Sequence, residues 1–191
     1  MNVKRALVAC VFLLLSANAA AQTYFLGGSL GQSDFDESIA IPFPITSGTV
    51  DSKDTAFKLY GGGFFGRHFG AELAYVNLGK AGYAGEFFGD AVTGGKVEVW
   101  GYNVAALARF PLNERLELFG KLGVFLWESE SSDVTNGTAF SSGARSWDAG
   151  SFGLGAAWRF TPNVSARVEW ERFPVGDADA SLLSIGLQYS F

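Results

Sequence analysis

The chain has 191 residues, of which 48% are apolar, 15% aromatic and only 17% charged, and its formal net charge is −5. This composition is too apolar for a disordered protein, and the acidic balance argues against a nucleic-acid-binding protein, which needs Lys and Arg to neutralise phosphates. The 25 glycines argue against a helical bundle, because each Gly weakens a helix interior by about 1 kcal/mol. The length fits one domain.

Residues 1–21 are predicted to be a secretory signal peptide. Two cationic residues precede an apolar run at 6–15, and the small residues at 19–21 are those that a signal peptidase reads. The run is shorter than the roughly 20 residues of a transmembrane helix. We therefore expect residues 22–191 to form the exported domain, which contains no cysteine because the chain has only Cys10.

Eight segments of the exported domain alternate apolar and polar residues with the period of two that is typical of a β-strand. They lie at 24–31, 55–65, 69–78, 97–110, 116–127, 151–160, 164–171 and 183–191. Short turns at 66–67, 111–115 and 161–163 alternate with longer connections at 34–53, 79–95, 129–148 and 174–180. This order predicts an all-β fold, an eight-stranded antiparallel up-and-down β-barrel.

The length of the segments favours a transmembrane barrel, since about 10 residues suffice for a tilted strand to cross the hydrocarbon of a membrane. The alternative is a soluble barrel of the lipocalin kind, with its aliphatic face turned inward around a ligand. Aromatic residues gather at both ends of the segments, as in the girdles of membrane barrels. Near the short turns these are Phe64, Phe65, Phe69, Phe110, Trp158, Phe160, Tyr189 and Phe191, and towards the longer connections Tyr75, Trp100, Trp127, Trp170 and Phe173.

Four stretches of sequence carry a family resemblance: GG at 61–62 leading into FGAELAY at 69–75, FGKLG at 119–123, RFTPN at 159–163 and RVEW at 167–170. They resemble the N-terminal eight-stranded transmembrane domain of the outer-membrane protein A (OmpA) family. The resemblance implies a protein of the Gram-negative outer membrane, surrounded by lipid and lipopolysaccharide and without a cofactor. The chain stops at the last strand, so we expect the family's C-terminal peptidoglycan-binding domain to be absent.

The last segment ends on alternating aromatic residues, Tyr189 and Phe191. This ending resembles the signal that the outer-membrane barrel assembly machinery reads. It implies that this machinery and periplasmic chaperones are partners during assembly of the chain.

If the aliphatic face contacts lipid, the opposite face brings charged and polar side chains into the lumen. The residues expected there are Lys58, Glu72, Asn103, Arg109, Glu117, Lys121, Arg159, Arg167, Glu169, Glu171 and Gln188. Five cations and four anions nearly balance, and an eight-stranded barrel has room for little more than its own side chains. We therefore expect a packed network of ion pairs, in which the turn at 111–115 sets Arg109 near Glu117.

The family resemblance implies that Glu72 and Arg167 correspond to an interior ion pair that takes part in a gate for a narrow water path. A second charged pair of the family is missing, since Leu107 and Ala157 stand at the aligned positions. Two hypotheses therefore stay open for the lumen: a fixed plug of ion pairs, and a narrow passive pore gated by Glu72 and Arg167.

A lipid-modifying enzyme is a third and more remote hypothesis. Such a barrel needs a histidine base near its outer rim, whereas the single histidine, His68, follows a short turn at the other end. We expect a monomer that is not an enzyme and holds no metal, with a structural or surface-interaction role. Its working part would be the polar, acidic extracellular loops at 39–52 and 129–146, whose surface ligand the sequence does not name.

Overall fold

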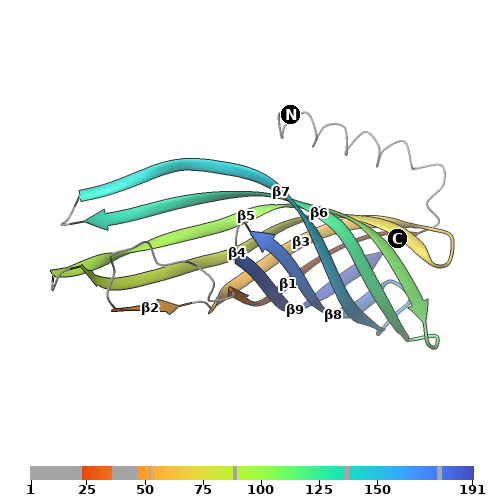
Figure 1. Cartoon of the computed structure of the whole chain (residues 1–191). Coiled ribbons are helices and arrows are strands. Elements are labelled where there is room, and N and C mark those ends of the chain that lie inside the picture. The colour runs from red at the N-terminus through yellow and green to blue at the C-terminus, as the bar shows by residue number, and fades with distance from the viewer. Residues whose placement is uncertain (1–22, 36–46, 52, 88–89, 136–137, 176–177) are drawn as a thin grey trace.

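A computed structural model describes residues 23–35, 47–51, 53–87, 90–135, 138–175 and 178–191. This part of the chain is almost entirely β-strand (Figure 1). The strands are β1 (Thr23–Phe35), β2 (Ser47–Asp51), β3 (Lys53–Phe65), β4 (Phe69–Phe87), β5 (Asp90–Pro111), β6 (Leu116–Thr135), β7 (Thr138–Arg159), β8 (Val164–Val175) and β9 (Ala178–Ser190). Within the described ranges, no helix has the length and apolar character needed to cross a membrane.

Eight of these strands close into the antiparallel barrel that the sequence predicts. Each strand from β3 to β9 pairs with its neighbour in the chain. The first strand, β1, pairs with β3 on one side and with the last strand, β9, on the other. Because β9 meets β1, the barrel has no free edge whose backbone N–H and C=O groups would lack partners.

The strand β2 is an addition to the predicted set of eight. Its five residues pair with Gly82 to Glu86 of β4. Strand β3 pairs with β4 only as far as Asn77, so β2 continues the sheet along the same edge of β4. The predicted loop at 39–52 therefore contains a strand, while residues 36–46 and 52, like the predicted signal peptide at 1–21, lie outside the described residues.

Two connections that the sequence predicts as long loops are strands in the structure. β4 and β5 continue to Phe87 and Asp90, and β6 and β7 continue to Thr135 and Thr138. Both hairpins extend past β1, β3, β8 and β9 at the end away from the short turns, and β2 runs beside the first of them (Figure 1). The prediction of loops at 79–95 and 129–148 is wrong. Period-two alternation marks a strand only where its two faces meet different surroundings, so it could not indicate these outer parts of the strands.

The extended hairpins reach well beyond the thickness of a membrane. The 22 residues of β5 span on the order of 70 Å at about 3.3 Å per residue. The hydrocarbon core of a bilayer is about 30 Å thick. Even with the tilt of a barrel strand, the outer parts of these hairpins therefore stand clear of the hydrocarbon.

The short turns lie where the sequence predicts them, at the opposite end. Between β3 and β4, Gly66 adopts a φ of 79°, in the left-handed region that favours glycine. In the turn before β6, the Oδ1 of Asn113 accepts hydrogen bonds from the backbone N–H groups of Arg115 and Leu116, at 2.9 and 2.8 Å. These local bonds fix tight turns and thereby the register of the strands that follow.

The direction of the side chains excludes the ligand-carrying soluble barrel. On β8, Arg167 and Glu169 are buried, whereas Val168 and Trp170 are 46% and 37% exposed. The same alternation covers the outer surface with exposed aliphatic residues, among them Leu26, Leu30, Leu59, Leu118, Leu122, Leu154, Leu183, Ile185 and Leu187. An apolar belt of this extent is typical of a surface that contacts lipid.

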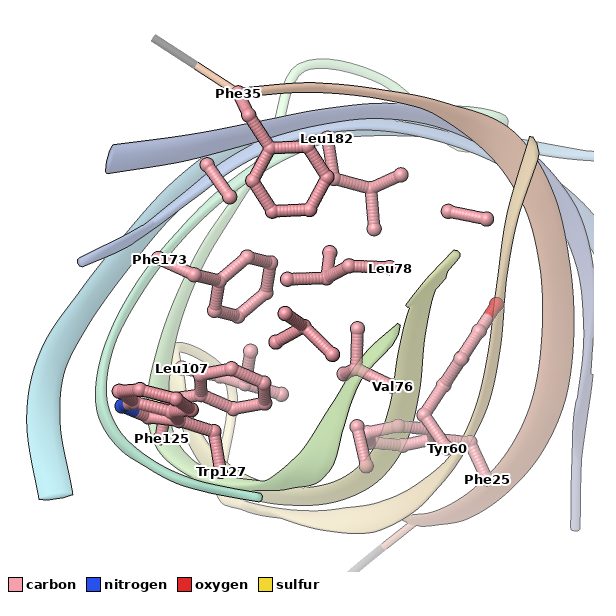
Figure 2. Packing of buried hydrophobic residues seen from close by; sticks show 14 of the residues in the cluster. Phe25, Phe35, Tyr60, Val76, Leu78, Leu107, Phe125, Trp127, Phe173 and Leu182 are labelled. Carbon is pink, nitrogen blue, oxygen red and sulfur yellow. The ribbon is translucent and has the colours of Figure 1, made fainter. Parts of the chain in front are cut away.

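The aromatic residues fulfil the predicted girdles only in part. Near the short turns, Phe69, Phe110, Trp158, Phe160, Tyr189 and Phe191 are exposed on the outer surface. Phe64, Trp127 and Phe173, by contrast, are buried, because each shares the inward parity of its strand. Figure 2 shows Trp127 and Phe173 among the side chains packed inside the barrel.

Candidate functional site

Six charged side chains meet inside the barrel, and we call them the charge cluster. They are Lys58 on β3, Glu72 on β4, Lys121 on β6, and Arg167, Glu169 and Glu171 on β8. Each is at most 4% exposed. Three cations face three anions, so the cluster is neutral as a whole, which is the condition under which charges are tolerated away from water.

Lys121 lies at the centre of the charge cluster. Its Nζ lies 3.1 Å from Glu72 Oε1, 2.7 Å from Glu169 Oε2 and 2.5 Å from Glu171 Oε1. Oxygen atoms of these three carboxylates lie within 4.8 Å of one another, a spacing that could hold a metal ion. The ammonium group of Lys121 already contacts all three, so it supplies the positive charge that a cation would otherwise bring.

Glu72 and Arg167 join opposite walls of the barrel. Glu72 Oε2 lies 2.7 Å from Arg167 Nη2, and the contact is an ion pair without the geometry of a regular hydrogen bond. Arg167 also pairs with Glu169 and donates to Gln188 Oε1 at 3.1 Å. Its guanidinium carbon lies 4.2 Å from the ring centre of Phe119, a cation–π distance.

Lys58 completes the charge cluster from β3. Its Nζ pairs with Glu169 and lies 2.5 Å from Glu171 Oε2. Strand β3 does not pair with β8, so this contact crosses the lumen. Lys58 has the inward parity expected from the sequence, but its partners could not be read from parity, which gives the face of a residue and not its neighbours across the barrel.

A glycine makes room for the charge cluster. A Cβ on Gly153 would lie 2.8 Å from Glu171 Cγ and 3.0 Å from the backbone oxygen of Trp170. Both distances are closer than ordinary van der Waals contact, so Gly153 is required by close approach and not by its backbone angles. The inward glycine therefore belongs to the site as much as the charged residues do.

An apolar layer lies in the lumen between the charge cluster and the extended hairpins. It consists of Phe35, Val76, Leu78, Val99, Phe125, Trp127, Phe173, Ala180 and Leu182, all at most 6% exposed. The rings of Phe125 and Phe173 lie 4.7 Å apart, and Figure 2 shows them side by side inside the barrel. On β4, β6 and β8 these side chains share the inward parity of the charge cluster and lie one to three residue pairs further along the strand.

The apolar layer was not predicted from the sequence. An inward Phe on a strand whose other inward residues are charged gives no periodic signal of its own. Phe173, for example, follows Arg167, Glu169 and Glu171 at the same parity, and its place near a strand end predicts a residue of the aromatic girdle instead. Strand parity could have found the layer, because it assigns Phe125 and Phe173 to the inward face. Their distance from a strand end carries no such information.

The other side of the charge cluster opens towards the short turns. Arg109 Nη1 lies 3.9 Å from Glu117 Oε2, and the guanidinium carbon of Arg109 lies 3.8 Å from the ring centre of Phe64. Arg159, expected inside the lumen, lies instead exposed at the rim and donates to the backbone oxygen of Glu114 at 3.3 Å. It is too close to the turn at 161–163 to reach the charge cluster.

The remaining predicted residues are not members of the charge cluster. Leu107 and Ala157 are buried in the lumen, and together with Arg167 they line a cavity of only about 10 Å³. Asn103 accepts a hydrogen bond from Ser151 at 2.7 Å. Tyr189 on β9 and Phe191 just after its end are exposed, with their ring centres 5.1 Å apart.

Comparison with known proteins places this geometry among outer-membrane barrels. A family model described as outer membrane protein beta-barrel domain matches residues 7–191. Outer membrane protein A of Yersinia pseudotuberculosis is 29% identical over 199 residues, which cover 96% of this chain and 53% of that protein. Its counterpart from Escherichia fergusonii is 26% identical over 180 residues, covering 88% and 48%. The chain thus spans about half the length of the curated relatives that it matches.

Solved structures share the fold. The crystal structure of Ail, the attachment invasion locus protein of Yersinia pestis, matches with a TM-score of 0.59 at 19% identity, over 88% of this chain and 98% of Ail. Neisserial surface protein A matches with a TM-score of 0.55 at 13% identity, over 88% and 97%. At these identities the comparison concerns the barrel architecture alone.

Proposed function

Because the chain belongs to the outer membrane protein beta-barrel domain family, it is an outer-membrane β-barrel, and we propose that it acts there as a closed structural barrel with a surface-interaction role. The single observation that supports closure is the filling of the lumen by two layers in series. The charge cluster fixes the walls to one another, and the apolar layer next to it excludes water. An ion would have to shed its hydration shell to pass the second layer.

The interaction end of the barrel is proposed to be the pair of extended hairpins. β4–β5 and β6–β7 project beyond β1, β3, β8 and β9, away from the short turns (Figure 1). Outer-membrane barrels place short turns in the periplasm and longer connections outside the cell. This orientation puts the hairpins, including residues 129–146, where a surface ligand or lipopolysaccharide can meet them.

We further propose that Tyr189 and Phe191 serve the assembly of the barrel. Tyr189 is 48% exposed on the outer face of β9, next to β1, and Phe191, the residue after the end of β9, is 72% exposed. An outward aromatic pair on the strand that closes the barrel is available to assembly factors before closure. Periplasmic chaperones and the assembly machinery are the proposed partners.

A narrow gated pore remains the second candidate function, and one observation favours it. Glu72 contacts two cations from different strands, Arg167 at 2.7 Å and Lys121 at 3.1 Å. A carboxylate with two partners has the geometry for an exchange between them. The exchange alone would not open the lumen, however, because the apolar layer does not depend on Glu72.

A lipid-modifying enzyme is the remote alternative, and we propose a non-enzymatic role instead. His68 is exposed beside a short turn, and its Nδ1 contacts the backbone oxygen of Arg109 at 3.2 Å. As the only histidine of the chain, it would have to be the base. A lipid-modifying site would lie near the outer rim, at the end of the extended hairpins. His68 lies at the opposite end of the barrel.

Single-channel conductance in a planar bilayer tests the closed barrel against the gated pore. The refolded protein and its Glu72→Ala variant are compared after both have been shown to change electrophoretic mobility on heating in detergent, which reports folding. We expect no steady openings from either protein, because the apolar layer is intact in both. Steady openings in the native protein that change with Glu72→Ala would refute the closed barrel and establish the pore.

A further inference from the structure

A cavity of about 660 Å³ lies at the mouth of the barrel among the short turns. Four arginines line it: Arg67, Arg109, Arg115 and Arg159. Two carboxylates, Glu114 and Glu117, lie in the same wall. The cationic excess stands out in a chain whose net charge is −5, and it contrasts with the neutral charge cluster further inside.

The arginines of this mouth are largely free of carboxylate partners within the described part of the chain. Arg67 and Arg115 are exposed, and neither guanidinium makes an ion pair with a described carboxylate within 4.0 Å. Arg159 donates to a backbone oxygen. Only Arg109 has a carboxylate nearby, and Glu117 lies at the long distance of 3.9 Å.

The backbone holds two of these guanidinium groups in place. Arg109 donates from Nε to the oxygen of Arg67 at 2.9 Å, which ties β5 to the turn between β3 and β4. Arg159 ties β7 in the same way to the turn between β5 and β6, through the oxygen of Glu114. The mouth is therefore a built ring of turns, with the guanidinium groups of Arg67 and Arg115 available for a ligand.

We propose that this mouth binds a phosphate group. The planar guanidinium fork matches the oxygens of phosphate, and several forks around one concave site suit a doubly charged oxyanion better than a single carboxylate. The volume lies in the range of small-ligand sites, about 300 to 1,000 Å³. The proposal does not depend on whether the lumen beyond Arg167 is closed.

Two sources can present this phosphate. A soluble phosphate or phosphate ester would enter along the barrel axis. A phospholipid headgroup would reach the mouth from the side, because the turn that carries Arg115 also exposes Leu112 (59%) and follows Phe110 (61%) at the lipid boundary. Both sources offer the same group to the same arginines.

The experiment has one arm for each source. In the first, the refolded protein in an uncharged detergent is titrated with inorganic phosphate, and with chloride at equal ionic strength, while the backbone amide resonances of the turn at 112–115 are followed by NMR. In the second, the same resonances are followed while phosphatidylglycerol is titrated into the uncharged detergent micelles, which contain no phosphate of their own. The test variant is Arg67→Gln/Arg115→Gln. The matched control is Lys53→Gln/Lys80→Gln, since these exposed lysines form exposed ion pairs with Asp34 and Glu98, near the rim opposite the short turns.

We expect a saturable shift in at least one arm that chloride does not reproduce. Loss of both arginines should weaken it by about tenfold or more, because charge-assisted hydrogen bonds are removed, and the lysine control should behave as the native protein. A response in the first arm alone assigns a soluble phosphate, and in the second alone a headgroup. No saturable shift in either arm, or an unchanged response in Arg67→Gln/Arg115→Gln, would overturn the proposal.

Discussion

The carboxylate of Glu72 on β4 lies 2.7 Å from the guanidinium of Arg167 on β8, and these two strands face each other across the barrel. Arg167 in turn pairs with Glu169, and Glu169 with Lys58 and Lys121. Opposite walls are therefore connected by one continuous set of ion pairs. A change at any member alters the charge balance of all the others.

Glu72→Gln should lower the free energy of unfolding by about 3–5 kcal/mol, because it leaves three buried cations facing two anions. The measurement is urea-induced unfolding of the protein in lipid vesicles, followed by tryptophan fluorescence. Glu114→Gln serves as an exposed control and should change stability by less than about 0.5 kcal/mol.

The double variant Glu72→Gln/Lys121→Gln separates charge balance from loss of contacts. It restores neutrality, so its loss of stability should be smaller than the sum of the two single losses. Strictly additive losses would show that the six charges act as independent pairs and that the charge cluster is not one network.

Gly153→Ala should destabilise the barrel by about 1–3 kcal/mol, since the added Cβ would lie 2.8 Å from Glu171 Cγ inside a packed site. Gly120→Ala is the matched control on the neighbouring strand, where the nearest atom to the added Cβ is 3.6 Å away, an ordinary contact. The same urea titration compares the two. Equal effects of both substitutions would mean that Gly153 is not required for packing against the charge cluster.

Charge on the outer surface should cost most at the middle of the membrane. Leu122 is 71% exposed near the centre of the membrane-spanning part of β6, and Leu122→Arg should cost about 2–4 kcal/mol in a lipid bilayer. Leu112 is 59% exposed at a short turn, so Leu112→Arg should cost about 0–1 kcal/mol. Unfolding in vesicles measures both, and a Leu122→Arg as mild as Leu112→Arg would contradict the lipid-facing assignment of this belt.

Water should reach the lumen from the short turns only. Ser165 borders the mouth cavity, whereas Ala180 lies fully buried in the apolar layer. In a Cys10→Ser background, a charged thiol reagent should modify Ser165→Cys readily and Ala180→Cys much more slowly. Mass spectrometry of the folded protein follows the reaction, and equal rates would show that the apolar layer does not exclude water.

The sequence by itself determined the barrel and the two faces of its strands. Alternation over about ten residues is enough, because one face of a membrane strand meets lipid and the other meets the lumen. The same alternation assigned Glu72, Lys121, Arg167, Glu169 and Glu171 to the inward face, where the structure places them. This assignment needs only the order of residues along one strand and no knowledge of which strands lie beside it.

Only the tertiary structure decided which inward residues meet. Parity predicts that Lys58 and Glu169 both face the lumen. Closure of the barrel and the tilt of its strands bring these two side chains, on β3 and β8, to the same depth along the barrel axis. Phe125 and Phe173 have the same parity as the charged residues but lie at a different depth along the barrel axis, where they belong to the apolar layer. The outer parts of the hairpins could not be predicted for a related reason. Outside the membrane the two faces of a strand no longer meet different surroundings, so the sequence there need not alternate.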